Sequence, residues 1–370
     1  MKYYIIAGEA SGDLHGSNVI REIYRQDPDA QIRAWGGDLM QEAGAEVVKH
    51  IRDLAFMGFV EVLQNLRQIK RNFDFCKSDI MQFQPDVLLC IDYPGFNLRM
   101  CKWAKQKGYK TVLYIAPQAW AWKEKRAYTL PHICDDVISI LPFEKEFFKK
   151  FGLEVHYVGH PLADAISRFR ENPDQIDTQN SKPIVSLLPG SRKNEIKNML
   201  PVYLKVMHAF PQYQFVVAGA PAIPESFYRQ CGLPPEVPIY FSRTYACLNS
   251  SHAAIVSSGT ATLETALFQV PQMICYKGNP ISYFIVKQWI KIPYVSLVNL
   301  ILNKALVKEF LQYDLTPENL IQELQQLCEN ESYRSEIKSG YNALHRLCGE
   351  GGASQKAAQI IVARAKALPA

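Results

Sequence analysis

The sequence contains no apolar run near the roughly 18 residues that a membrane-spanning helix requires, although 48% of its 370 residues are hydrophobic. It also lacks the order of a signal peptide, because Glu9 and Asp13 interrupt the N-terminal segment before a long apolar core could form. Its nine cysteines form no C-x-x-C pair and show none of the spacing of a zinc site. We therefore expect a cytoplasmic protein whose cysteines are reduced and serve packing.

A strong charge imbalance is absent too, since the formal net charge is +5, and we predict no nucleic-acid partner. The basic residues are nevertheless unevenly distributed. Between positions 99 and 126, eight Lys and Arg residues stand against the single acid Glu124. This basic stretch could serve solvation alone, hold a phosphorylated ligand or lie against anionic lipid headgroups, and we leave these interpretations open.

The pattern of strands and helices predicts an α/β fold with two Rossmann-like domains. A chain of 370 residues is too long for one ordinary core, and we place the first domain at 1–168, together with a final helix within 350–370, and the second at 182–346. The polar segment 169–183 contains prolines and is the predicted linker. The final helix follows three glycines and is expected to cross back onto the first domain.

Short apolar strands alternate with helical patterns in both halves, which is typical of a parallel sheet covered by helices on both faces. The expected strands of the first domain are 3–7, 32–35, 85–91, 111–115, 137–141 and 155–158. Those of the second domain are 184–188, 214–218, 239–241, 253–256 and 272–276, and residues 281–313 are expected to be helix and loop.

Ligands of such sheets bind beyond the carboxyl ends of the strands. Asp92 directly follows the strand at 85–91, and a carboxylate in this position is well placed to act as a general base. We expect residues 93–95, Tyr-Pro-Gly, to keep the chain from entering a helix at once. In the alternative interpretation, Asp92 only caps this turn.

The turn at 8–13 connects the first strand to a helix expected from about Leu14. Its small residues would let a ligand approach the backbone closely, and we assign Glu9, Ser11 and Gly12 to the substrate-binding set. The glycine spacing does not match the G-x-G-x-x-G pattern of dinucleotide-binding proteins, so a nicotinamide cofactor is disfavoured.

The segment 184–196 in the second domain has the form of a phosphate site, with a buried strand, a glycine turn at Gly190 and the start of a helix. Ser191 is the expected N-cap, and Arg192 can hold phosphate oxygens with two hydrogen bonds. In the alternative interpretation, Arg192 is an ordinary surface charge.

A second turn of this kind, Ser258, Gly259 and Thr260, follows the strand at 253–256. Glu264 lies one helical turn further on and suits the hydroxyls of a ribose. Two such turns in one domain suggest a bound nucleotide, although the hydroxyl groups could also only cap their helix.

The segment from Leu54 to Val60 has large apolar residues in succession, which fits neither a surface helix nor an alternating strand. It is either buried between the domains or a loop that touches a membrane, and the basic residues at 67, 70 and 71 favour the membrane. The expected membrane or acyl contacts are Phe56, Met57, Phe59 and Val60.

Taken in order, these segments resemble the lipid-A-disaccharide synthases, inverting glycosyltransferases of the GT-B class whose two Rossmann-like domains face a cleft. The similarity extends nearly from end to end, and the ordered set of motifs is highly specific. The motifs are AGEASGD (7–13), MGFVEVL (57–63), IDYPGFN (91–97), WAWKEKR (120–126), LPFEK (141–145), GHPL (159–162), LLPGSR (187–192), SSGTATLE (257–264) and YVSLVNL (294–300).

The resemblance implies that UDP-2,3-diacylglucosamine donates its sugar to 2,3-diacylglucosamine 1-phosphate, which gives a β(1→6) disaccharide and UDP. Asp92 would be the base, the two phosphate turns would hold the diphosphate, Glu264 would bind the ribose and Asn299 would contact the leaving group or sugar. We expect no metal and no cofactor, because helix dipoles together with Arg192 can stabilise the negative charge of the diphosphate. The acylated substrates imply attachment to the inner face of a bacterial inner membrane, and a homodimer is left open.

Two other classes share parts of this pattern. Another UDP-sugar enzyme of the same architecture, such as a UDP-N-acetylglucosamine epimerase or a different UDP-N-acetylglucosamine transferase, would have the same nucleotide turns but no use for an exposed apolar segment. A non-catalytic two-domain binding protein would bind a ligand without turnover, and it would normally carry an export signal. Release of UDP from a mixture of two sugar substrates distinguishes the synthase from both.

Overall fold

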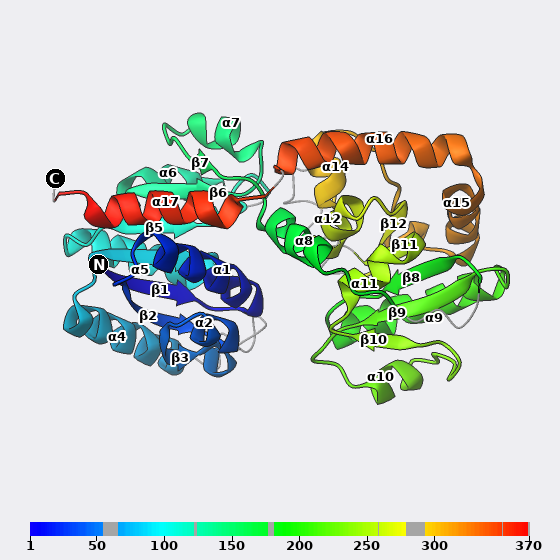
Figure 1. Cartoon of the computed structure of the whole chain (residues 1–370), viewed down its shortest axis with the longest axis horizontal. Helices are drawn as coiled ribbons and strands as arrows, with labels where there is room; N and C mark the ends of the chain where they lie inside the picture. Colours follow the sequence, from blue (N-terminus) through cyan, green and yellow to red (C-terminus); the bar gives the residue numbers. More distant parts are fainter. Residues whose placement is uncertain are drawn as a thin grey trace. The chain divides into compact units, whose positions relative to one another are not determined.

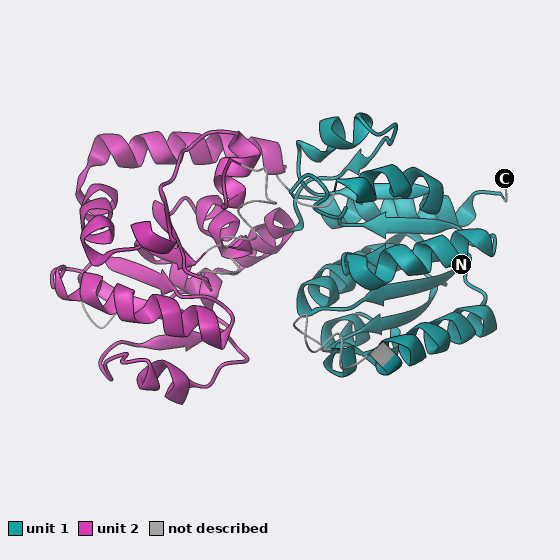
Figure 2. Cartoon of the chain, turned by 180° about the vertical axis from the view of Figure 1, so that it is seen from behind, with its two compact units in different colours: residues 1–161, 351–370 teal, residues 162–350 magenta. Residues whose placement is uncertain are grey.

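The computed structural model describes residues 1–54, 66–121, 124–176, 181–257, 259–278, 293–349 and 351–368. The chain forms two compact units, the first made of residues 1–161 with 351–370 and the second of residues 162–350 (Figure 2). Each unit is built around one parallel sheet with helices on its faces (Figure 1). The expected α/β fold with two parallel-sheet domains is confirmed.

The sheet of the first unit has, among the described residues, seven strands in the order β3-β2-β1-β4-β5-β6-β7. They are β1 (Lys2–Ala7), β2 (Gln31–Gly36), β3 (Glu46–His50), β4 (Val87–Ile91), β5 (Thr111–Tyr114), β6 (Asp136–Ser139) and β7 (His156–Tyr157). The strand order reverses between β1 and β4, and loops beyond the carboxyl ends of strands at such a switch point are the favoured place for ligands. Strand β3 was not expected from the sequence.

Two apolar clusters cover the two faces of this sheet, which explains why its strands are apolar almost without interruption. Tyr3 and Ile5 of β1 belong to one cluster, together with Ile361, whereas Tyr4 and Ile6 belong to the other. The helices of the unit are α1 (Ala10–Gln26), α2 (Asp38–Glu42), the 3-10 helix η1 (Ile51–Leu54), α4 (Leu66–Phe83), α5 (Pro94–Gln106), α6 (Lys125–Ile133), α7 (Glu144–Lys149) and α17 (Ala353–Lys366).

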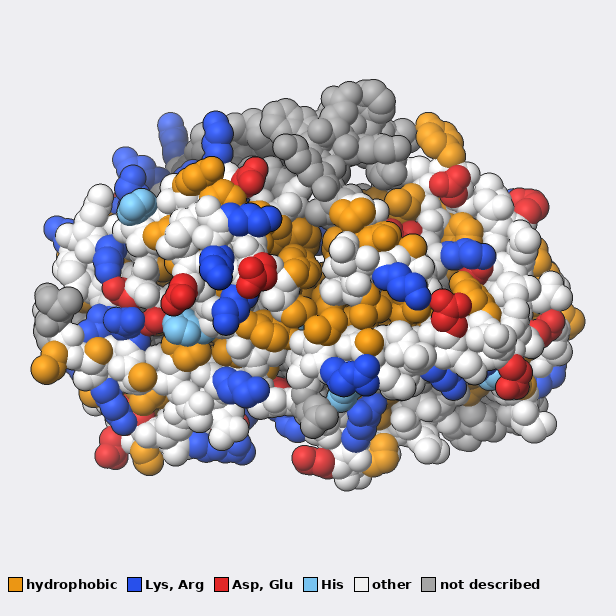
Figure 3. All heavy atoms as spheres, turned by 90° about the horizontal axis from the view of Figure 1, so that it is seen from above, with side chains coloured by type: hydrophobic (Ala, Val, Ile, Leu, Met, Phe, Trp, Pro, Cys, Tyr) orange, Lys and Arg blue, Asp and Glu red, His pale blue; other side chains and the backbone are white. Residues whose placement is uncertain are grey.

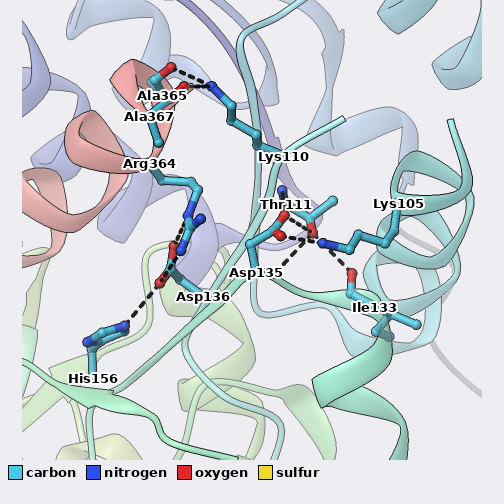
Figure 4. A network of polar contacts seen from close by, with 10 residues as sticks. All are labelled: Lys105, Lys110, Thr111, Ile133, Asp135, Asp136, His156, Arg364, Ala365 and Ala367. Carbon is cyan, nitrogen blue, oxygen red and sulfur yellow. Dashed lines mark hydrogen bonds and ion pairs between the residues drawn. The ribbon is translucent and has the colours of Figure 1, made fainter. Parts of the chain in front are cut away.

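Helix α17 is the last helix of the chain, and it packs against the first unit, as expected from the sequence. Its apolar side meets α1 and the sheet, and polar contacts fix its end (Figure 4). Arg364 forms an ion pair with Asp136 at 2.5 Å, and the amino group of Lys110 donates to the carbonyl oxygens of Ala365 and Ala367. The C-terminal segment is therefore part of the first unit although it follows the second in sequence.

The sheet of the second unit has, in the described part of the chain, six strands in the order β10-β9-β8-β11-β12-β13. They are β8 (Ile184–Leu188), β9 (Gln214–Gly219), β10 (Ile239–Phe241), β11 (Ser251–Ser257), β12 (Gln272–Tyr276) and β13 (Glu309–Leu311). The helices are α8 (Pro161–Glu171), α9 (Lys193–His208), α10 (Glu225–Gln230), α11 (Thr244–Asn249), α12 (Thr260–Leu267), α14 (Leu297–Leu302), η2 (Gln312–Asp314), α15 (Pro317–Glu329) and α16 (Glu331–Cys348). The expectation that residues 281–313 hold only helix and loop is wrong at β13, a three-residue strand that pairs with β12.

The division between the units falls at residue 161, seven positions before the expected end of the first domain at residue 168. Phe169, the first residue of the expected linker, still belongs to α8 and packs edge-to-face against Tyr245 and Phe268 of the second unit. Aromatic packing with residues distant in sequence thus extends the second unit toward the N-terminus. In the part of the chain that the structure describes, no helix is long and apolar enough to cross a membrane.

Candidate functional site

The turn after β1 leads into the helix earlier than expected, because α1 begins at Ala10 and not near Leu14. Glu9 is the N-cap residue in extended conformation, and both Glu9 and Ser11 are exposed. Gly12 is buried, and a Cβ atom on it would lie 3.1 Å from the Cβ of Ala7. Close packing of helix on strand therefore accounts for Gly12, and its assignment to the substrate-binding set stays a prediction.

Asp13, the last residue of the AGEASGD motif, has a structural partner that the sequence did not reveal. Its buried carboxylate accepts hydrogen bonds from the backbone N–H groups of Gly37 (2.7 Å), Met40 (3.1 Å) and Leu39 (3.2 Å). It thus caps the N-terminus of α2, where a negative charge is favoured. A Cβ atom on Gly37 would lie 2.5 Å from Oδ2 of Asp13, so the cap requires glycine at that position.

Asp92 follows β4 directly and lies at the carboxyl end of the sheet, half-buried. Its backbone φ is 46°, and that of Tyr93 is 49°, so two consecutive residues with side chains adopt the left-handed conformation. Helix α5 then begins at Pro94. The expectation that residues 93–95 keep the chain from entering a helix at once is wrong, because the left-handed pair reverses the chain in two residues and proline suits the first helical turn.

The surroundings of Asp92 disfavour its charged form. Burial is the largest cause that raises the pKa of its carboxyl group, and the negative charge of Glu9 raises it further. A hydrogen bond with the backbone of Tyr93 partly opposes this shift. A carboxylate whose pKa is raised accepts a proton more readily than an exposed one, which is the property that a general base requires.

Glu144 is another buried carboxylate of this unit, and it was not predicted as functional. Its side chain is 1% exposed and accepts hydrogen bonds from Nε1 of Trp120 (3.1 Å) and from the backbone N–H of Leu141 (3.2 Å). Burial raises the pKa of Glu144 to about 7, against the effect of these hydrogen bonds. The carboxylate therefore fastens the loop after β5 to the loop after β6, and Trp120 is part of this anchor.

In the glycine turn of the second unit, the carboxylate of Glu195 already binds the backbone N–H groups. Oε2 of Glu195 accepts hydrogen bonds from the backbone N–H groups of Ser191 (2.9 Å) and Arg192 (3.3 Å). A Cβ atom on Gly190, whose φ is 117°, would lie 2.5 Å from the same oxygen. The N-cap of α9 is Arg192 and not Ser191 as expected, because Glu195 in the first turn binds back to this position.

The guanidinium group of Arg192 is 68% exposed and lies 3.6 Å from Oε1 of Glu195. An ion pair this exposed contributes little to stability. Arg192 is therefore available to a ligand, whereas the two N–H groups of the turn are already hydrogen-bonded. Its role in phosphate binding stays a prediction.

The second expected phosphate turn is described in part, since Ser258 lies outside the described residues. Gly259 and Thr260 are exposed at the start of α12, and φ of Gly259 is 147°. Thr262 donates to the carbonyl oxygen of Gly259 at 2.8 Å. Glu264 is half-buried, accepts a hydrogen bond from the hydroxyl of Tyr245 (3.0 Å), and has a pKa that burial raises.

Asn299 is fully buried, and all four hydrogen-bonding positions of its amide are occupied. Its Nδ2 donates to the carbonyl oxygen of Val307 (2.8 Å) and to Glu309 (2.9 Å), and its Oδ1 accepts from the N–H groups of Leu306 (2.9 Å) and Val307 (3.1 Å). Asn299 thus fastens the segment before β13 to α14. This arrangement favours a structural role, and the expected contact with the leaving group stays a prediction.

The expected membrane contacts Phe56, Met57, Phe59 and Val60 lie outside the described residues. Leu54, the residue that ends η1 before them, is buried in the core of the first unit. The basic residues Arg67, Lys70 and Arg71 at the start of α4 are exposed. Over the face that Figure 3 shows, Lys and Arg side chains are spread with Asp and Glu side chains among them.

An open cavity of ≈ 410 Å³ is lined by residues of α4 and by Arg99 of α5. Lys70, Lys77 and Arg99 line it together with Asp74 and the ring of Phe73. This cavity is more basic than acidic and belongs to the unit that carries Asp92. Within the described residues, no group of three or more His, Cys, Asp and Glu side chains has the arrangement of a metal site.

Comparison with known proteins gives consistent results over the whole chain. The family model described as lipid-A-disaccharide synthetase matches residues 3–363. Lipid-A-disaccharide synthase from Geobacter sulfurreducens is 33% identical over 369 residues, which cover 97% of this chain and 96% of the relative. The synthase from Coxiella burnetii is 35% identical over 365 residues, which cover 96% of each chain.

Solved structures with a similar fold include two classes of sugar enzyme. UDP-GlcNAc 2-epimerase from Neisseria meningitidis, bound to UDP-GlcNAc, superposes with a TM-score of 0.67 at 13% identity, covering 98% of this chain and 100% of that one. The calicheamicin glycosyltransferase gives a TM-score of 0.63 at 14% identity, covering 98% and 97%. At these identities the likeness shows the GT-B fold alone.

Proposed function

This chain belongs to the lipid-A-disaccharide synthase family of glycosyltransferases, and we propose that it transfers 2,3-diacylglucosamine from its UDP conjugate to the 6-hydroxyl of 2,3-diacylglucosamine 1-phosphate. The products are a β(1→6)-linked disaccharide 1-phosphate and UDP. The observation that carries this proposal is the match to the family model over residues 3–363. The epimerases share only the fold, so the epimerase alternative is not favoured.

In the proposed mechanism, Asp92 removes the proton from the acceptor hydroxyl as that oxygen attacks the anomeric carbon. The bond from this carbon to the diphosphate breaks in the same step, which inverts the configuration. Support comes from the position of Asp92 at the carboxyl end of β4, beside the switch point of the sheet, and from the raised pKa of its carboxyl group. Glu9, Ser11 and Gly12 in the neighbouring turn are proposed to contact the sugar.

The second unit is proposed to bind the UDP moiety. Negative charge develops on the leaving diphosphate, and fixed positive groups stabilise it best when they are in place before the reaction. Arg192 is exposed beside the turn at Gly190 and Ser191, and Gly259 and Thr260 begin α12, so both turns offer groups for the phosphates. Ser258 is assigned to the second turn on the sequence alone.

We assign the ribose to Glu264 and propose that the reaction requires neither a metal nor another cofactor. The carboxylate of Glu264 already accepts a hydrogen bond from Tyr245, which orients it. In this proposal, the guanidinium group of Arg192 and the N-terminus of α12 supply the positive charge that a metal ion supplies in other transferases. Asn299 holds the segment before β13 in place, and its contact with the leaving group or sugar is part of the proposal.

The proposed reaction is tested by incubating the full-length protein with both acylated substrates and measuring the product mass. We expect a β(1→6) disaccharide 1-phosphate and one UDP for each disaccharide formed. Each substrate alone should give no product. Formation of an epimerised UDP-sugar in the absence of acceptor, or binding without UDP release, would contradict the proposal.

We also propose that the protein attaches to the inner-membrane surface through Phe56, Met57, Phe59 and Val60. The exposed basic residues Arg67, Lys70 and Arg71 at the start of α4 support attachment to anionic lipid. Each large apolar side chain withdrawn from water contributes roughly 1.5 to 3 kcal/mol, and each basic residue near the surface adds about 1 kcal/mol. A few such contacts suffice for reversible binding.

The double variant Phe56→Ser/Phe59→Ser is expected to melt like the wild type but to lose sedimentation with anionic liposomes. Phe75→Ser, a change at an exposed phenylalanine on α4, serves as the control for a general loss of surface apolarity. A strongly lowered melting temperature with unchanged liposome binding would show that the segment belongs to the core. Ultracentrifugation of the same preparations tests the homodimer.

A further inference from the structure

The side chain of Asn97 lies directly behind the proposed base. Asn97 is on the first turn of α5 and is fully buried. Its Nδ2 atom lies 2.8 Å from the carbonyl oxygen of Asp92, 3.1 Å from that of Ile91 and 3.3 Å from that of Ile6. One amide group therefore joins the ends of β1 and β4, the two strands between which the strand order of the sheet reverses.

The backbone that Asn97 holds is strained. Asp92 and Tyr93 both have positive φ values near 50°, at 46° and 49°, a conformation that residues with a Cβ atom rarely adopt. Such residues persist only where the surroundings fix them, and they gather at functional sites. A direct hydrogen bond to the carbonyl group of the first strained residue is a strong local restraint.

Other contacts fix the same turn from different directions. The N–H of Asp92 donates to the carbonyl oxygen of Tyr114 at 2.9 Å. The ring of Tyr93 occupies the space over Gly8, where a Cβ atom would lie 2.4 Å from the ring, and it stacks on Phe96. These contacts hold the N–H of Asp92 and the side chain of Tyr93, which leaves the Asp92 carbonyl group to Asn97.

Of the two polar atoms of the Asn97 side chain, only Nδ2 forms hydrogen bonds with the described residues. Its Oδ1 atom is buried and has no hydrogen-bond partner among the described residues. A buried acceptor without a partner is unfavourable, so packing alone does not account for asparagine at this position. The donor function is what the amide contributes, and its nearest acceptor belongs to Asp92.

We propose that Asn97 is a positioning residue for the glycosyl transfer, one that holds the left-handed backbone of Asp92 so that its carboxylate stays aligned with the acceptor hydroxyl. The proposal rests on the proposed function, in which Asp92 is the base. It assigns no contact between Asn97 and substrate. Its effect is on alignment, and small misplacements of a reacting group can lower a rate by about 100-fold.

The test uses full-length Asn97→Ala and Asn97→Ser, assayed at a temperature at which circular dichroism shows both to be folded. We expect kcat of Asn97→Ala to fall roughly 10- to 100-fold, with KM for the UDP-sugar and the affinity for UDP unchanged. Asn97→Ser keeps a short donor and should recover part of the lost rate. The control Thr111→Val removes the hydrogen bonds of a buried hydroxyl to Ile133 and Asp135, at the opposite end of the sheet, and it should lower stability without lowering kcat.

A double-mutant cycle with Asp92→Asn separates positioning from a general structural effect. If Asn97 acts through Asp92, adding Asn97→Ala to Asp92→Asn lowers the residual rate by less than about twofold. Multiplicative losses, or a normal kcat in folded Asn97→Ala, would overturn the proposal. If Asp92→Asn itself keeps normal turnover, the assignment of the base fails first, and that outcome is distinct from failure of Asn97 alone.

Discussion

Asp92→Asn is expected to lower turnover by roughly 100-fold or more, the usual scale for the loss of a general base. The amide has the shape of the carboxyl group, so the fold and the affinity for UDP should be unchanged. The measurement is kcat with both acylated substrates, alongside a melting curve and calorimetry with UDP. Near-normal turnover in the folded variant would exclude Asp92 as the base.

The pH dependence of the wild type provides an independent check of the same prediction. A base acts in its deprotonated form, so kcat/KM should fall as pH is lowered through the pKa of Asp92. Because burial and the charge of Glu9 raise that pKa, the fall should begin at higher pH than for an exposed aspartate. Glu9→Gln removes the neighbouring charge and should move the acid limb to lower pH, whereas an unmoved limb would show that another group controls it.

Arg192→Ala is expected to weaken UDP binding by tenfold or more, because a guanidinium group that holds phosphate by two charge-assisted hydrogen bonds has no substitute in alanine. Stability should change little, since the side chain is exposed and its ion pair with Glu195 is weak. Calorimetry with UDP measures the effect. Lys205→Ala removes one exposed positive charge further along α9 and controls for net charge. Equal affinities in the wild type and Arg192→Ala would remove Arg192 from the phosphate site.

The same site should work without a metal ion. Activity is expected to be unchanged after treatment with EDTA, because the proposed mechanism takes the positive charge at the diphosphate from the protein. Loss of turnover with EDTA and recovery with magnesium would show that the metal-free mechanism is wrong. Calorimetry with and without magnesium then tells whether the metal acts on binding or on the chemical step.

Local sequence patterns were sufficient for most of the fold. Strands β1 and β8 are short apolar runs, each followed by a glycine turn, and such runs are typical of buried strands. The two missed strands are short edge strands: β3 has partly polar residues, and β13 has only three residues. Each depends on pairing with a strand that lies nearby in space, which a local pattern does not contain.

The same distinction between local sequence patterns and contacts in space applies to the candidate site. The sequence predicted Asp92 because it directly follows an apolar strand, and Arg192 because it follows a strand and a glycine turn. Position after a strand is a local property of the sequence. It did not identify the left-handed backbone at Asp92 and Tyr93, since contacts from α5 and β5 hold that conformation. Ser191 was expected as the N-cap of α9, because serine is favoured before a helix. In the structure the N-cap is Arg192, whose backbone N–H donates to the carboxylate of Glu195.

By itself, the sequence determined the two-domain α/β fold, the family and the residues expected to carry the chemistry, because strands, turns and ordered motifs are encoded by neighbouring residues. Only the tertiary structure decided which polar side chains form hydrogen bonds within the protein. Asp13 caps α2, Glu144 anchors Trp120, and Asn97 holds Asp92. Asp13 and Gly37 are 24 residues apart in the sequence, as are Glu144 and Trp120. The amide of Asn97 also donates to the carbonyl oxygen of Ile6 in β1, which is 91 residues away. A hydrogen bond requires correct distance and direction in space, and folding alone brings such distant groups together.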